Sequence, residues 1–233
     1  MGRIALPGNP PISVDLRRSA AARRISLRLS GIDGRVTLTL PRRVPEAEGI
    51  AFLREKEGWL RRHLSDRAPE VPVGPGAILP LEGAPHEIVS GAGRGVRIED
   101  GRLAVPGDPA TSGARLRAWL RERARTRLAA ASDRHAAALG RRYDRITLRD
   151  TRSRWGSCSS AGALMYSWRL ILAPPEVLDY VAAHEVAHLA EMNHSPDFWA
   201  VVDRLCPGWR AQRDWLRREG GGLHRYRFET TQD

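Results

Sequence analysis

One short stretch, HEVAHLAEMNHSPDFW at residues 184–199, holds three of the chain's seven histidines and a glutamate within eleven positions. Successive residues of an α-helix rotate by about 100°, so His184 and His188 lie on one side of a helix, one turn apart. Two imidazoles placed in this way can both reach one zinc ion at about 2 Å. Glu185 follows the first of them, where it can hold a water molecule rather than bind the metal. The stretch therefore predicts a metal site on a helix.

The third ligand of such a site requires a break in this helix. A catalytic zinc ion takes three protein ligands and keeps one position open. His194 lies ten residues beyond His184, too far along a continuous helix to reach the same ion. Asn193 suits the left-handed conformation that ends helices. Ser195 can cap a new helix with Pro196 at its first position. The sequence thus predicts that the chain folds back and brings His194 to the metal.

Two alternatives remain open for this ligand set. Glu191 is a rival third ligand, because it lies about one turn beyond His188. The histidines can also be structural residues that are hydrogen bonded near a core. Against this, His184, Glu185 and His188 match the H-E-x-x-H pattern of zinc peptidases. Zinc is the expected cofactor, since histidine ligation with an open tetrahedral position favours it over other divalent ions.

The first part of the chain has the pattern of a strand-rich module. Four segments alternate apolar and polar residues as strands do: 24–29, 35–40, 86–90 and 96–105. The first two flank a glycine-bearing turn and predict a β-hairpin. After Pro45, apolar residues recur at helical spacing and predict one amphipathic helix that ends before Pro69. We expect this module to cover residues 1–108.

The rest of the chain, residues 109–233, changes to helices and short strands. Leucine or alanine recurs at every fourth position within 110–140, which predicts a long helix with Gly140 as its stop. Two segments alternate with period two and predict strands: 145–150 and 163–172. Pro174 and Pro175 end the second strand and open the helix that carries the histidines. The chain is therefore expected to be an α+β protein.

The segment SRWGSC precedes the second of these strands. Gly156 permits a close backbone approach, a bulge or a tight bend. Trp155 and Cys158 are expected in the core rather than as reactive groups. Arg154 has two open interpretations: it binds an anionic group or an oxyanion of a substrate, or it forms a structural salt bridge.

The net charge of +11 raises the question of a nucleic-acid partner. Lys56 is the only lysine, so arginine supplies 37 of the 38 basic residues, and this bias partly resembles genome composition. Acidic neighbours accompany the arginines in most helical stretches. The densest run contains four arginines: Arg17, Arg18, Arg23 and Arg24. Without interleaved aromatic residues, we expect at most weak, nonspecific contact with nucleic acid through this surface.

The location of the protein is predicted from three features. The stretch MGRIALPGNPPISVDL lacks the apolar core and the cleavage site of a secretory signal. No apolar run approaches the roughly 20 residues needed to cross a bilayer. Cys158 and Cys206 are far apart and lie in no C-x-x-C arrangement, so free thiols are expected and a disulfide is the alternative. These features predict a cytoplasmic protein without membrane contact.

Three segments resemble the YgjP-like zinc metallopeptidases: TRSRWGSC at 151–158, WRLILAPPEVLDYVAAHEVAHL at 168–189 and NHSPDFW at 193–199. That family is related to the SprT-like and WLM proteases. The N-terminal hairpin shares the resemblance, which therefore covers most of the chain. It implies a zincin-like catalytic domain over 109–233. It also implies roles for four residues: His184, His188 and His194 as zinc ligands and Glu185 as the catalytic glutamate.

The leading hypothesis is zinc-dependent hydrolysis of a protein or peptide substrate, with Glu185 passing a proton from water to the leaving amine. The strand at 164–172 can pair with an extended peptide beside the cleft. Arg154 and Tyr166 are candidate substrate contacts. Two alternatives keep the metal: a nucleotide or phosphoanhydride hydrolase, and a DNA-associated SprT-like protease recruited by the basic surface.

Overall fold

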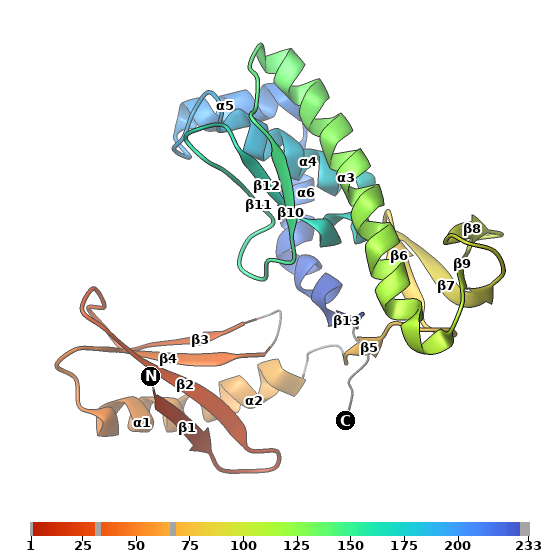
Figure 1. The fold of residues 1–233 in the computed structure, drawn as a ribbon. Coiled ribbons are helices and arrows are strands. Elements are labelled where there is room, and N and C mark those ends of the chain that lie inside the picture. Colours follow the sequence, from red (N-terminus) through yellow and green to blue (C-terminus); the bar gives the residue numbers. More distant parts are fainter. Residues whose placement is uncertain (1, 31–33, 66–68, 229–233) are drawn as a thin grey trace. The chain divides into compact units, whose positions relative to one another are not determined.

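The computed structural model describes residues 2–30, 34–65 and 69–228. Its internal contacts divide the chain into two compact units, Met1–Pro69 and Glu70–Asp233 (Figure 1). The boundary expected near residue 108 lies inside the second unit. The difference has a physical reason: the strands between residues 70 and 108 share one apolar core with the helices that follow them. Contacts of this kind join segments far apart in sequence, so local patterns do not reveal them.

The unit Met1–Pro69 is a four-stranded sheet with two helices. Its strands, in the order β1-β2-β4-β3, are β1 (Gly2–Leu6), β2 (Ile12–Ser19), β4 (Val36–Pro41) and β3 (Ser26–Leu29). The antiparallel pair β3–β4 confirms the predicted hairpin, whose turn residues 31–33 lie outside the described residues. Strands β1 and β2 were not predicted from the sequence.

The helix predicted after Pro45 is two helices, α1 (Glu46–Glu55) and α2 (Glu57–Ser65), which meet at Lys56. Leu53 of α1 and Leu60 of α2 are fully buried. They belong to one apolar core with the inward side chains of the sheet. The amphipathic pattern was thus interpreted correctly, but the break at Lys56 was not foreseen.

The unit Glu70–Asp233 begins with a second sheet. Its strands, in the order β6-β7-β9-β8, are β6 (Ile78–Leu81), β7 (Ala84–Gly91), β9 (Arg102–Pro106) and β8 (Arg97–Glu99). Strands β7, β8 and β9 confirm the predicted segments 86–90 and 96–105 with a turn in the second. A short strand β5 (Val71–Pro72) pairs with β13 (Tyr226–Arg227) near the end of the chain.

A short 3-10 helix η1 (Pro109–Thr111) leads into the long helix α3 (Ser112–Leu139). Gly140 ends α3 in the left-handed conformation, with φ of 66°, as the sequence predicted. The buried face of α3 carries the leucine and alanine residues that recur at every fourth position: Leu116, Leu120, Ala124 and Leu128.

A third sheet, in the order β10-β12-β11, lies beside α3 (Figure 1). It consists of β10 (Ile146–Arg149), β12 (Leu164–Ser167) and β11 (Gly156–Cys158). The strand predicted over 163–172 is wrong in its second half, since residues Trp168–Leu172 form the 3-10 helix η2. All five residues of η2 are buried and four of them are apolar, and a short buried helix of this kind cannot be told from a buried strand by periodicity alone.

The position of β12 also corrects its predicted role. β12 is the central strand, parallel to β10 and antiparallel to β11. Both of its edges are therefore occupied, and it cannot pair with a peptide. Within the described residues, the strand β11 has a neighbour on one side and a free edge on the other.

The remaining helices are α4 (Pro175–Ala187), α5 (Pro196–Leu205), α6 (Trp209–Arg218) and the 3-10 helix η3 (Gly220–Arg225). Their apolar faces join α3 and the strands in one core. The α+β class with a strand-rich N-terminal part is confirmed. Across the described parts of the chain, no helix is both long and apolar enough to span a bilayer.

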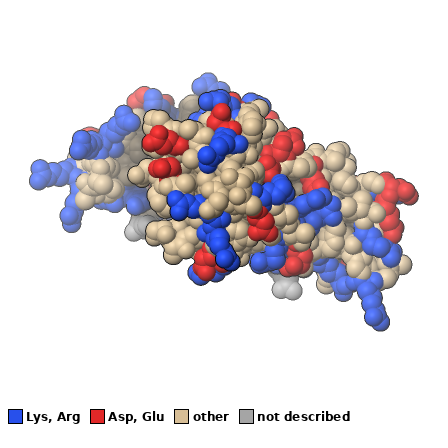
Figure 2. Space-filling view, turned by 90° about the horizontal axis from the view of Figure 1, so that it is seen from above, with Lys and Arg blue, Asp and Glu red and all other residues tan. Residues whose placement is uncertain are grey.

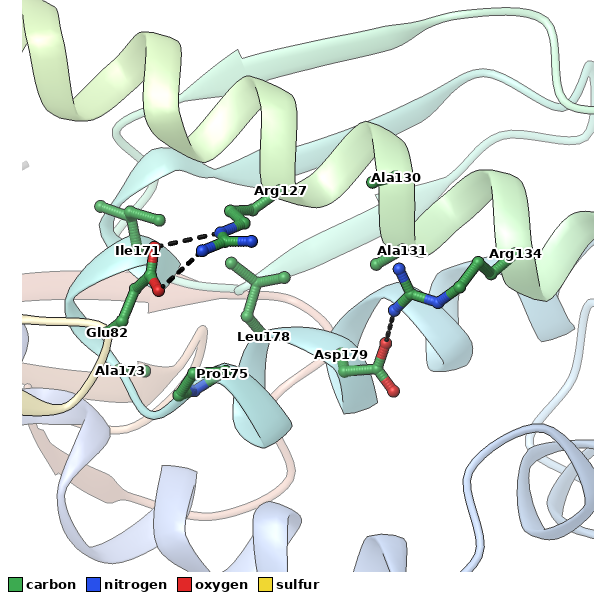
Figure 3. Close-up of a pocket in the computed structure, with 10 residues that line it drawn as sticks. All are labelled: Glu82, Arg127, Ala130, Ala131, Arg134, Ile171, Ala173, Pro175, Leu178 and Asp179. Carbon is green, nitrogen blue, oxygen red and sulfur yellow. Dashed lines mark hydrogen bonds and ion pairs between the residues drawn. The ribbon is translucent and has the colours of Figure 1, made fainter.

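Ion pairs hold α4 against α3 (Figure 3). Arg134 of α3 lies 2.7 Å from a carboxylate oxygen of Asp179 on α4, and His135 lies 3.1 Å from the same oxygen. Burial raises the pKa of Asp179, but the hydrogen bond from His135 and the charge of Arg134 outweigh it and hold the pKa below its usual value. A second pair joins Arg127 of α3 to Glu82, in the turn between β6 and β7, and both residues line a cavity of about 210 Å³. The helix with the predicted metal ligands is thus fixed at its N-terminal half.

Candidate metal centre

The three histidines of the opening stretch converge. His184 lies in the last turn of α4, His188 ends that helix, and His194 comes from the loop before α5. One ligand nitrogen from each lies within 4.8 Å of the others, and the Nε2 atoms of His184 and His194 are 3.1 Å apart. We call these three residues the histidine cluster. The predicted return of the chain to the helix is present.

The helix ends differently from the prediction. Asn193 does not take the left-handed conformation, since the described non-glycine residues with positive φ are Glu82 and Asp100. Instead, short-range hydrogen bonds tighten the end of α4: Leu189 N donates to Val186 O at 2.9 Å, and Ala190 N to Ala187 O at 3.0 Å.

The start of the next helix follows the prediction. Ser195 Oγ accepts a hydrogen bond from Phe198 N at 3.3 Å, and Pro196 occupies the first turn of α5. This cap fixes the point at which α5 begins, directly after His194. The loop between the two helices is therefore held at both ends.

The backbone of this loop also orients one imidazole. His188 Nδ1 lies 2.9 Å from the carbonyl oxygen of Glu191. A proton on Nδ1 donates to that carbonyl and leaves the lone pair of Nε2 for a metal ion. Glu191 thus acts through its backbone, and its carboxylate is outside the group of ligand atoms found among the described residues. Sequence patterns do not show such a backbone contact.

Two aromatic residues of α5, Phe198 and Trp199, cover the histidine cluster. The ring centre of the fully buried Phe198 lies 4.9, 4.5 and 4.8 Å from those of His184, His188 and His194. The ring of Trp199 stacks on His194 at 5.8 Å. The imidazoles therefore have an apolar wall on this side, which excludes water and favours neutral rings.

The cluster fits a divalent metal ion bound through nitrogen. Burial, together with the neighbouring His188 and His194, lowers the pKa of His184 to about 3. Burial also lowers the pKa of His188. Neutral imidazole is the form that binds metal. The Nε2 atom of His184, which lies 3.1 Å from Nε2 of His194, is the nitrogen available to the ion.

Glu185 is 5% exposed and lies against the strand β11. Burial raises its pKa to about 8, and the positive charge of Arg154 opposes that rise. Arg154 is exposed and lies two residues before β11. The structure therefore brings the predicted base and one predicted substrate contact into electrostatic reach of each other.

Tyr166, the other predicted substrate contact, is a correction. Its side chain is fully buried, and its hydroxyl lies 3.0 Å from Ser132 Oγ of α3. Burial raises the pKa of the phenol. A side chain without exposed surface cannot contact a substrate, so Tyr166 joins β12 to α3 instead. The alternation of β12 did not reveal which face was covered.

The family model of the YgjP-like metallopeptidase domain matches residues 23–219 of the chain. The chain belongs to the YgjP-like metallopeptidase family. This membership makes the protein a peptidase and confirms the resemblance found in the sequence. The three residues of the histidine cluster lie within the matched range.

Other comparisons add little to this membership. The crystal structure of the metallopeptidase zymogen of Pyrococcus abyssi abylysin is similar, with 23% sequence identity and a TM-score of 0.36. The similarity covers 40% of this YgjP-like chain and 92% of that chain. No curated protein matches the chain.

Both cysteines of this YgjP-like metallopeptidase are free, as expected. Burial, together with the negative charge of Glu185, raises the pKa of Cys158 to about 11. Burial also raises the pKa of Cys206. A protonated thiol is a poor nucleophile and a poor metal ligand, and among the described residues the group of possible metal ligands contains neither cysteine.

A cavity of about 530 Å³ lies beside the histidine cluster, with His188 in its lining. Its other walls come from the end of α3, the loop between β11 and β12, and the turn after α4. Arg141 and Arg142 contribute the charged part of the lining. The sequence analysis missed these two residues, because nothing local to them indicates that they approach the metal helix.

Proposed function

We propose that this YgjP-like metallopeptidase hydrolyses peptide bonds with zinc held by the histidine cluster and with Glu185 as the general base. The observation that carries the proposal is the convergence of three ligand nitrogens, within 4.8 Å of one another, around the end of the helix that also bears Glu185. An all-nitrogen donor set with neutral imidazoles favours zinc.

The chemistry divides between the ion and the chain. Zinc, when bound, acidifies water towards a pKa of about 7 and polarises a carbonyl group. Glu185 supplies the proton transfer: a carboxylate oxygen accepts the proton of the attacking water and returns it to the leaving amine. The orientation of His188 by the Glu191 carbonyl keeps its Nε2 directed to the metal.

The free edge of β11 is the proposed place for the substrate backbone. An extended peptide can add to a strand edge through main-chain hydrogen bonds, and β11 passes directly over Glu185. Arg154, exposed and close enough to influence Glu185, is the proposed partner of a carbonyl oxygen or an acidic group of the substrate.

Family membership favours peptides over nucleotides as substrates. Contact with nucleic acid stays a prediction, and so does the cytoplasmic location. Arg17, Arg18, Arg23 and Arg24 are exposed, but on the face that Figure 2 shows, acidic side chains lie among the basic ones. Interspersed charges of both signs weaken attraction to a polyanion.

Chelation tests the proposed activity. We expect the purified chain to cleave members of a peptide library, to lose this activity after treatment with a chelator, and to regain it when zinc is added back. Mass spectrometry of the products measures cleavage, and phosphate release from a nucleotide panel serves as the comparison. Phosphate release without peptide cleavage would overturn the proposal in favour of a nucleotide hydrolase.

A further inference from the structure

No space for a side chain exists between Glu185 and the backbone of β11. A Cβ atom placed on Gly156 would lie 2.5 Å from Oε1, 2.6 Å from Cγ and 2.7 Å from Cδ of Glu185. Real Cβ atoms essentially never come within 3.0 Å of another heavy atom. Gly156 is not among the glycines with positive φ, so its backbone conformation alone admits any residue. The contact with Glu185 is therefore the reason that this position needs glycine.

The strand cannot move away to make room. The carbonyl of Trp155 accepts a hydrogen bond from Ser167 N at 2.8 Å. The ring of Trp155 packs on His224 at 5.2 Å between centres, and it lies so close to Gly220 that a Cβ there would be 3.0 Å from the ring. Both the backbone and the side chain of Trp155, the residue before Gly156, are thus held in place.

The partner strand is fixed as well. Gly156 lies opposite Tyr166 in the antiparallel pair β11–β12. Tyr166 is fully buried, and its hydroxyl lies 3.0 Å from Ser132 Oγ on α3. A methyl group added at Gly156 must therefore displace the Glu185 side chain, which is the more flexible of the two contacting groups.

We propose that Gly156 is a positioning residue: its missing side chain lets the Glu185 carboxylate lie against β11 in its working position. The assignment rests on the proposed role of Glu185 as the base. It gives the glycine of the RWGSC segment a defined function. It also predicts that a methyl group at residue 156 acts through Glu185 and through no other contact.

A stability cycle tests the contact without reference to activity. We expect Gly156→Ala to lower Tm by on the order of 5 °C in the full chain, as overpacking does. In a Glu185→Ala background the same change should leave Tm unaltered, because the three clashing atoms are gone. Gly222→Ala, with no heavy atom within 4 Å of the added Cβ, is the matched control and should leave Tm unchanged in both backgrounds.

Calorimetry of the six chains, namely the two backgrounds each alone, with Gly156→Ala and with Gly222→Ala, supplies the result. If Gly156→Ala alone does not fold, recovery of folded protein on adding Glu185→Ala supports the contact equally. An equal loss of Tm in both backgrounds would overturn the proposal, since the methyl group would then act on something other than Glu185.

A kinetic cycle tests the positioning role. We expect Gly156→Ala to lower kcat of peptide hydrolysis by roughly 10²-fold, with KM and bound zinc unchanged, as a misplaced catalytic group does. In a Glu185→Gln background, Gly156→Ala should cause no further loss. Wild-type kcat in Gly156→Ala, or an equal further loss in the Glu185→Gln background, would overturn the positioning role. Absence of peptide hydrolysis in the wild-type chain would count against the proposed function instead, while the stability cycle still decides the contact.

Discussion

Glu185→Gln is expected to lower kcat of peptide hydrolysis by roughly 10²–10⁴-fold while zinc stays bound. Glutamine preserves the shape of the side chain but cannot accept the proton of the attacking water. The residue is 5% exposed, so no solvent group replaces it at the same place. Steady-state kinetics on a cleaved peptide, together with metal analysis of the same preparation, measures both quantities.

The matched control for this substitution lies on the same helix. Glu176 stands in the first turn of α4, is exposed, and is two turns from the histidine cluster. Glu176→Gln should therefore keep wild-type kcat. If Glu185→Gln turns over at the wild-type rate, or loses its zinc, the assignment of Glu185 as the general base is wrong.

Arg169→Met is expected to lower the free energy of unfolding by about 2–4 kcal/mol, because two buried backbone carbonyls lose their donor and each buried unsatisfied group costs about 1–3 kcal/mol. Arg169 is 7% exposed and binds both oxygens of Asp150, at 2.7 and 3.1 Å. Its guanidinium also donates to the carbonyls of Leu223 and Tyr226. The substitution leaves two buried carbonyl oxygens without their donor and removes the partner of the Asp150 carboxylate, whose side chain is 42% exposed. Denaturant unfolding at pH 7 measures the loss.

The same pair predicts a dependence on pH. Burial raises the pKa of Asp150, but the hydrogen bonds and charge of Arg169 outweigh it and hold the pKa below its usual value. A depressed carboxyl pKa stabilises the fold above the unfolded value of about 3.9, and this contribution is lost as pH falls through the folded value. The wild-type chain should therefore lose more stability than Arg169→Met on acidification below about pH 4.

Arg145→Met is the control for Arg169→Met. Arg145 forms an exposed pair with Asp144 at 2.6 Å, and exposed pairs contribute about 0–1 kcal/mol. A destabilisation of Arg169→Met no larger than that of Arg145→Met would show that the network around Asp150 does not stabilise the chain as the geometry indicates.

Local rules predicted the features that depend on neighbouring residues. The stop of α3 at Gly140 and the cap of α5 at Ser195 follow from backbone chemistry within a few positions. The return of His194 to the helix followed from the number of ligands that a catalytic zinc ion needs. Family resemblance, carried by the same motifs, was confirmed over residues 23–219.

Features set by contacts across the fold were beyond local patterns. The central place of β12 and the burial of Tyr166 depend on strands and helices that are distant in sequence. The contact between Gly156 and Glu185 joins residues that are 29 positions apart in the sequence. A glycine can serve a bend, a bulge or a close approach, and the structure alone distinguishes these uses.

Metal analysis of the wild-type chain and of His188→Ala tests the central claim most directly. The control is His63→Ala, because His63 is exposed and lies outside the histidine cluster. Each protein is dialysed against dilute zinc and then against metal-free buffer, and its zinc content is measured by plasma mass spectrometry. We predict one zinc per chain in the wild type and in His63→Ala, and almost none in His188→Ala. A full equivalent of zinc in His188→Ala would contradict the account.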